Sequence, residues 1–114
     1  SDETIKLLES PYNEIFYSMA SVWEIAMKHK IKPQHMPMSE EEFVTLCEST
    51  GFIELPIKAE HIFLLKTLVR PMDAPKHNDP SDRILLAQAN YESLKLITHN
   101  LQLPYYEGSC IISV

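Results

Sequence analysis

The segment EIFYSMASVWEIAMKHK, residues 14–30, decides the fold class. It opens with apolar residues that are typical of a short strand over residues 14–18, and it continues with the apolar spacing of a helix. The helix is predicted over about residues 21–32, because Pro33 cannot continue helical hydrogen bonding. A strand that leads directly into a helix is the repeating unit of an α/β protein.

The alternation of strands and helices continues along the rest of the chain. Only Gly51 and Gly108 are available for left-handed turns, so a sandwich or barrel of many short hairpins is disfavoured. Strands separated by helices imply right-handed crossovers and a parallel sheet between helical layers, with ligands bound beyond the carboxyl ends of the strands. The other predicted elements are helices over residues 3–9, 39–51, 59–68 and 80–92, strands over residues 52–55, 94–98 and 110–114, and loops over residues 33–38 and 69–78.

Length and composition predict a single domain that spans residues 1–114. The chain is 45% hydrophobic, which is enough to bury one core but not two. Its net charge of −6 argues against a broad basic surface, so an RNA substrate would need a local patch or a bound metal ion. Cys47 and Cys110 form no metal-binding or redox motif, and no signal peptide or membrane-length apolar run is seen. A reducing cytoplasm is the expected location.

Glu24 is the first candidate for chemistry, because it lies in the first turn of a helix that follows a strand. If Ser21 is the N-cap of that helix, the Glu24 carboxylate stands at the ligand-binding edge of the sheet. Two structural alternatives exist: Ser21 and Glu24 form a capping box, which is the favoured interpretation on these residues alone, or Glu24 pairs with Lys28 one turn later. Residues 39–42 share the pattern, with Ser39 as the predicted N-cap of a helix that ends at Gly51. They follow a loop, so they are interpreted as a solvated helix start.

Asp82 is the second candidate, in the first turn of the helix predicted over residues 80–92. Asp79 is the expected N-cap of that helix, and an acid in the first turn is favoured by the helix dipole. A carboxylate at the head of an inward-facing stripe needs a metal ion or a cation as partner. The other members of this stripe are apolar: Leu85, Leu86 and Ala89.

Polar side chains also follow the predicted strand over residues 94–98. Thr98, His99 and Asn100 would emerge at the carboxyl edge of the sheet, although an ordinary exit from a strand has the same composition. His77 and His99 flank the acids without the spacing of a zinc site, so they are interpreted as loop residues that touch phosphate. The remaining histidines are predicted to be exposed: His29, His35 and His61.

Aromatic and methionine residues near loops and helix margins are predicted to lie mostly in the core. Some of them are expected to form a surface for a partner or for a second copy of the chain, because exposed clusters of this kind mark interfaces. They are Trp23, Met27, Met36, Met38, Tyr105 and Tyr106.

Two motifs together resemble the PIN domain, in its branch of VapC-like toxins. Residues 21–26, SVWEIA, resemble the S-x-W-E-I-A signature of that branch. Residues 77–83, HNDPSDR, resemble its H-x-D-P-F-D-R loop, and the sequence LAQA follows at residues 86–89. The order of motifs agrees over residues 14–100. The resemblance implies a three-layer α/β/α PIN-like fold with a mainly parallel sheet.

The resemblance also implies a function, that of a metal-dependent endoribonuclease from a toxin–antitoxin pair. Such enzymes hydrolyse RNA phosphodiester bonds with a cluster of carboxylates that binds Mg²⁺ or Mn²⁺. By matching positions, Glu24 and Asp82 are the expected metal ligands and catalytic acids, with Asp79 as an accessory acid. The implied partners are an RNA substrate, a small antitoxin protein and a second copy of the chain, without a membrane. The auxiliary positions are Thr98, Asn100 and His77.

Two features depart from the family pattern. The first strand of the family, which carries an Asp in the context L-D-T-H, has no counterpart, so the chain is expected to be a PIN-like domain that lacks its first strand. Asn100 stands where the family has a further acid, which removes one charge from the metal site. This chain alone is therefore expected to bind metal weakly or not at all and to be slow or inactive. The alternatives are a non-catalytic PIN-like interaction module and, less favoured, a DNA-directed nuclease.

Overall fold

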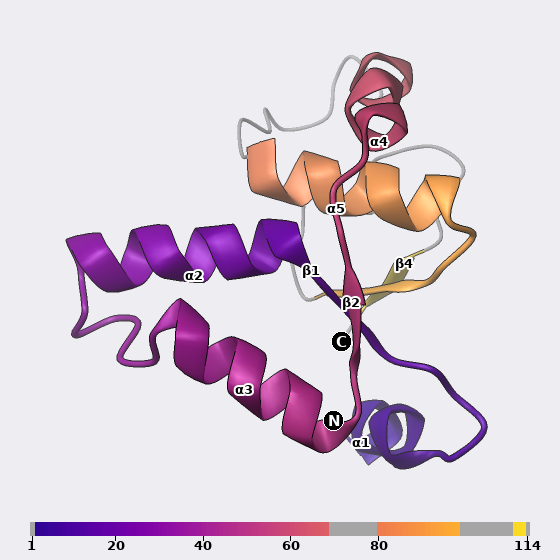
Figure 1. Ribbon diagram of the computed structural model, residues 1–114. Helices are drawn as coiled ribbons and strands as arrows, with labels where there is room; N and C mark the ends of the chain where they lie inside the picture. The colour runs from indigo at the N-terminus through magenta and orange to yellow at the C-terminus, as the bar shows by residue number, and fades with distance from the viewer. Residues whose placement is uncertain (1, 69–79, 99–110, 114) are drawn as a thin grey trace. The chain divides into compact units, whose positions relative to one another are not determined.

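A computed structural model describes residues 2–68, 80–98 and 111–113 as a mixed α/β protein (Figure 1). The chain divides into two compact units, Ser1–Pro56 and Ile57–Val114. Each described unit contains one pair of parallel strands, which confirms the α/β class and the parallel pairing expected from the sequence. Among the described residues, no helix has the length and apolar character needed to cross a membrane.

The first unit is a parallel strand pair joined through two helices that pack on each other. Phe16 lies opposite Ile53 and Ser18 opposite Leu55 in the parallel register. The helical hairpin between these strands is clear in Figure 1, where α2 and α3 run side by side. The elements of the first unit are α1 (Asp2–Glu9), β1 (Phe16–Ser18), α2 (Met19–Ile31), α3 (Glu40–Thr50) and β2 (Ile53–Leu55).

Helix α2 begins two residues earlier than the sequence predicts. Ser18 is its N-cap, and the Ser18 hydroxyl accepts a hydrogen bond of 3.0 Å from the Ala20 N–H. The strand-like backbone of Ser18 (φ −88°, ψ 143°) suits an N-cap, so β1 runs into α2 without a loop. The predicted start at Ser21 is therefore wrong, because the earlier serine already caps the helix through the Ala20 N–H.

Helix α3 has the two caps that the sequence predicts. The Ser39 hydroxyl accepts a hydrogen bond of 3.1 Å from the Glu42 N–H. Gly51 ends the helix in the left-handed conformation with φ 89°, where a residue without Cβ is favoured. The buried side chains of this unit include Cys47, a free thiol, and Tyr17, whose ring meets Phe43 edge-on at 6.3 Å.

The second unit packs its longest helix against the segment predicted as a helix over residues 59–68. That segment is helical as predicted, but it divides into an α-helix and a 3₁₀ turn that both contact α5. The described core of this unit consists of Leu86, Ala87 and Ala89 together with three buried polar residues, His61, Ser81 and Gln88. The elements are α4 (Ala59–Phe63), η1 (Leu64–Thr67), α5 (Pro80–Tyr91), β3 (Leu96–Thr98) and β4 (Ile111–Ser113).

One face of α2 carries large apolar side chains in contact with solvent. Trp23 is 52% exposed, Met27 43% and Ile31 67%, and their spacing of four residues aligns them along the helix. The prediction that such residues lie mostly in the core is therefore wrong for α2. Met36 and Met38 are half-buried. Tyr105 and Tyr106 lie outside the described residues.

Candidate functional site

Asp82 lies in the first turn of α5 and is half-buried, as the sequence predicts. The stripe that it heads turns inward: Leu86 is 1% exposed and Ala89 4%, while Leu85 is half-buried. A carboxylate in this place gains from the positive end of the helix dipole. The predicted position of Asp82 at the head of a buried face is confirmed.

The residues on either side of Asp82 fix the first turn of α5. Ser81 is buried at 4% exposure. The Arg83 Nη2 donates a hydrogen bond of 3.2 Å to the carbonyl oxygen of Leu65 in η1. The backbone at Asp82 is thus fixed by its two neighbours in the chain: Ser81 is buried, and Arg83 is hydrogen-bonded to η1.

The other end of α5 is held by a buried histidine. His61 is fully buried, and its Nδ1 accepts a hydrogen bond of 2.9 Å from the Lys58 N–H. A nitrogen that accepts an N–H carries no proton, so the ring is the neutral tautomer with hydrogen on Nε2. That Nε2 donates to Glu92 Oε1 over 3.0 Å, and the Tyr91 ring meets the imidazole edge-on. The prediction that His61 is exposed is wrong.

Glu92 accepts from two donors at one oxygen. Lys58 Nζ lies 3.2 Å from the same Oε1 that His61 contacts. The hydrogen bond from His61 and then that from Lys58 lower the pKa of Glu92 below its ordinary value of 4.5, although partial burial opposes them. The cluster of Lys58, His61 and Glu92, called here the α4–α5 clasp, joins the start of α4 to the end of α5.

Glu24 lies in the second turn of α2, because the helix begins at Met19. The capping-box interpretation is wrong, since Ser18 and not Ser21 is the N-cap. The alternative pairing is confirmed: Glu24 Oε1 lies 2.9 Å from Lys28 Nζ. A surface ion pair at this i,i+4 spacing contributes about 0.3–0.5 kcal/mol.

The other predicted site residues are only partly within the described part of the chain. Thr98 is the last residue of β3, which agrees with its expected place at the carboxyl end of a strand. Asp79, His77 and Asn100 lie outside the described residues. Glu24 belongs to the first unit and Asp82 to the second, and the positions of the chain's parts relative to one another are not determined (Figure 1).

The donor chemistry of the two described acids suits a hard divalent cation. Mg²⁺ and Mn²⁺ prefer oxygen ligands, above all carboxylates. Across residues 2–68, 80–98 and 111–113, no group of three or more His, Cys, Asp or Glu side chains could hold a metal ion.

The sequence prediction missed Arg83 and the α4–α5 clasp. His61 is the third residue of α4 and bonds back to the N-cap backbone, which is the geometry of a capping residue. A polar residue at the third position of a predicted helix is therefore a sequence signal for such a cap. The tie from Arg83 to Leu65 had no local signal, because 18 residues separate the donor from the acceptor.

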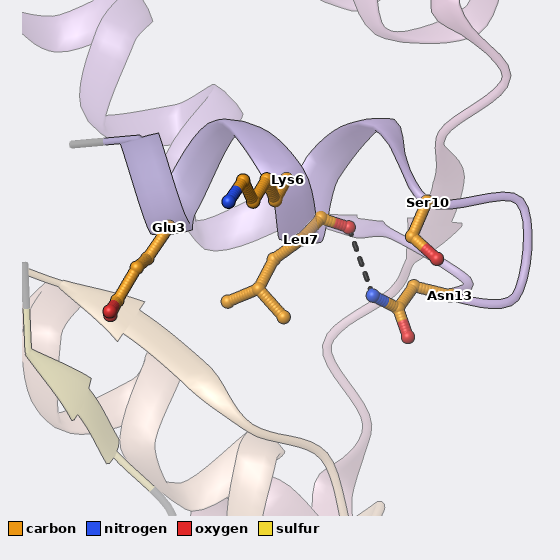
Figure 2. Close-up of a pocket in the computed structure, with 5 residues that line it drawn as sticks. All are labelled: Glu3, Lys6, Leu7, Ser10 and Asn13. Atoms are coloured by element: carbon orange, nitrogen blue, oxygen red, sulfur yellow. Dashed lines mark hydrogen bonds between the residues drawn. The ribbon is translucent and has the colours of Figure 1, made fainter.

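A hollow beside α1 has a different character from the acid positions. Figure 2 shows Glu3, Lys6, Leu7, Ser10 and Asn13 around it. Asn13 Nδ2 donates to the Leu7 carbonyl oxygen over 3.0 Å, which ties the turn after α1 to the helix. One acid beside one lysine gives no pair of carboxylates, so no chemistry is assigned there.

Comparisons of the chain with protein-family models, with curated proteins and with solved structures found no match.

Proposed function

We propose that this chain is a PIN-like domain with a three-layer α/β/α fold and acts as a metal-dependent endoribonuclease of the toxin–antitoxin type. The observation that carries the proposal is the place of Asp82, half-buried in the first turn of α5 at the head of an inward-facing stripe. The surrounding HNDPSDR motif and the parallel strand pairs support it.

In the proposed reaction, Glu24 and Asp82 hold Mg²⁺ or Mn²⁺ and Asp79 assists them. The metal ion, when bound, activates water and neutralises charge on the RNA phosphate. The acids would orient the ion, and the Glu24 carboxylate would exchange its 2.9 Å contact with Lys28 for the cation. Thr98 and Asn100 orient water at the strand end, and His77 contacts phosphate.

The charge of the chain limits how RNA is bound. A net charge of −6 repels a polyanion, so affinity has to come from the metal ion and from local contacts. Asn100 replaces one anionic ligand by a neutral amide, which weakens the hold on a hard cation. We therefore expect weak metal binding and slow or no cleavage by this chain.

The test compares variants of the two acids with a charge-matched control. Glu24→Gln and Asp82→Asn are each expected to lower Mn²⁺ affinity, measured by calorimetry, by about tenfold or more, because each removes one anionic ligand. Cleavage of a mixed RNA pool should fall in parallel wherever the wild type cuts. Glu41→Gln removes an exposed acid of α3 and should change affinity less than about twofold, because exposed charges are screened. Site variants that bind Mn²⁺ like the wild type would contradict the proposal.

A second candidate is a non-catalytic PIN-like interaction module. The exposed stripe of Trp23, Met27 and Ile31 on α2 favours it, since aligned apolar side chains mark partner surfaces. A small antitoxin protein or a second copy of the chain is the proposed partner, in the cytoplasm. The module is preferred if Met27→Glu abolishes self-association in sedimentation while Asp82→Asn leaves Mn²⁺ binding unchanged. Cleavage of single-stranded DNA in the same assay would favour the DNA-directed alternative.

A further inference from the structure

We infer that Arg83 is a positioning residue that sets the direction of the Asp82 side chain through its hydrogen bond to Leu65. The inference rests on the proposed function in so far as it treats Asp82 as a metal ligand. Its structural part, that Arg83 orders the first turn of α5, stands on the geometry alone.

The tie has the geometry of a brace between two elements. Arg83 Nη2 lies 3.2 Å from the Leu65 carbonyl oxygen, in a half-buried setting. Leu65 belongs to η1, and η1 packs against α5. The Leu65 carbonyl oxygen also accepts from the Leu68 N–H over 3.4 Å, and a carbonyl has two lone pairs, so it can accept from the guanidinium as well.

The brace acts at the residue next to the acid. Successive residues of an α-helix are about 100° apart around its axis. When the hydrogen bond holds the Arg83 side chain toward η1, it also fixes the rotation of the helix about its axis. The Cα–Cβ bond of Asp82 then points about 100° away from that of Arg83. A metal ligand needs this kind of control, because Mg²⁺ and Mn²⁺ sites are sensitive to the direction of each oxygen.

The α4–α5 clasp provides a matched control at the other end of the same helix. Glu92 lies ten residues after Asp82, which is about 15 Å along a helix that rises 1.5 Å per residue. Glu92→Gln removes the negative charge from the contacts to His61 and Lys58, which weakens the attachment of α5 to α4 but leaves the Arg83–Leu65 hydrogen bond beside Asp82 in place. A general loss of stability and a local loss of direction can therefore be separated.

The two central variants are Arg83→Met and Glu92→Gln in the full 114-residue chain. Methionine keeps an unbranched apolar stem and removes every donor. It also removes a positive charge, which by itself would raise the affinity for a cation, so a fall in Mn²⁺ affinity cannot come from the charge change. Arg83→Lys serves as the conservative variant, because it keeps the charge and one donor group but loses the planar fork.

Amide hydrogen exchange and Mn²⁺ calorimetry are the two measurements. We expect Arg83→Met to speed exchange in residues 84–87 and to lower Mn²⁺ affinity about tenfold, as is typical when a residue that orients a ligand is lost. Arg83→Lys should restore part of both. Glu92→Gln should speed exchange in residues 88–91 and leave Mn²⁺ affinity within about twofold, because its charge is distant and screened.

The outcomes separate this inference from the proposed function. Unchanged exchange in residues 84–87 of Arg83→Met overturns the inference, whatever the metal data show. Changed exchange with unchanged Mn²⁺ affinity also overturns it, provided that Asp82→Asn lowers that affinity. If Asp82→Asn has no effect on Mn²⁺, the proposed metal site fails, and the exchange data alone decide whether Arg83 orders the first turn.

Discussion

His61 shows how one buried polar residue can hold two helices together. Its ring is fully buried, accepts from the Lys58 N–H and donates to Glu92. We expect His61→Ala to lower the free energy of unfolding by about 2–4 kcal/mol, because it creates a cavity and leaves the partly buried Lys58 N–H without its acceptor. Urea unfolding followed by circular dichroism measures the change.

An exposed histidine is the control for that substitution. The side chain of His35 is exposed, so His35→Ala should stay within about 0.5 kcal/mol of the wild type. Equal midpoints for His61→Ala and His35→Ala would show that the buried hydrogen bonds contribute nothing to stability.

Glu92 should make the stability of the chain depend on pH in the acid range. Its pKa is lowered in the folded state, first by the hydrogen bond from His61 and then by that from Lys58. A carboxyl with a lowered folded pKa stabilises the fold fully above its ordinary value of 4.5, and this stabilisation is lost as the pH falls through the lowered pKa. The difference in stability between the wild type and Glu92→Gln should therefore shrink on acidification. A difference that stays constant from neutral pH to below the folded pKa would contradict it.

The residues that the sequence predicted well are those whose role is set by their neighbours in the chain. Ser39 and Gly51 have cap functions that depend on three or four adjacent residues, and both are confirmed. His61 and Arg83 acquire their roles from partners 31 and 18 residues away. A local pattern contains no information on such contacts, so the sequence could place Asp82 on its helix but could not identify the residues that hold that helix.

At the level of elements, the start of α2 decides what Glu24 does. The sequence predicts Ser21 as the N-cap, although Ser18, three residues earlier, has the same capping chemistry. The structure chooses Ser18, which lies at the carboxyl end of β1 and bonds the Ala20 N–H. Glu24 is therefore free of the capping role, and its carboxylate contacts Lys28.

Two alanine substitutions test this assignment. Ser18→Ala should cost about 1 kcal/mol of folding free energy, the usual value for loss of an N-cap. Ser21→Ala should stay within about 0.5 kcal/mol, because alanine is a better helix former than serine inside the first turn. Thermal unfolding of the two variants gives the comparison. A larger loss of folding free energy in Ser21→Ala than in Ser18→Ala would show that Ser21, and not Ser18, is the N-cap of α2.

The sequence predicts the boundary of a helix or strand only where neighbouring residues determine it. The helix predicted over residues 59–68 is correct in extent, but its change from α4 to η1 depends on packing against α5. The strands are shorter than predicted because pairing, and not apolar composition, defines a strand. Phe16–Ser18 pairs with Ile53–Leu55 over three residues, although the apolar run begins at Ile15.

For the whole molecule, the proposed function requires the two units to act as one domain. Glu24 and Asp82 lie in different units, and a shared metal ion would join them. Each unit is also close to the size of about 60 residues at which a domain alone is marginally stable. The small size of each unit agrees with the single domain over residues 1–114 that the sequence predicts, and this domain stays a prediction.

A single domain unfolds as one cooperative unit, and the position of the tryptophan allows a direct test. Trp23 is the only tryptophan of the chain and lies in the first unit, whereas His61 lies in the second. If the units form one domain, His61→Ala should shift the urea midpoint reported by Trp23 fluorescence as far as the midpoint reported by circular dichroism. A Trp23 midpoint that stays at the wild-type value would mean that the first unit folds independently. The proposed metal site would then have to form between two separately folded parts, at an entropic cost that a single domain avoids.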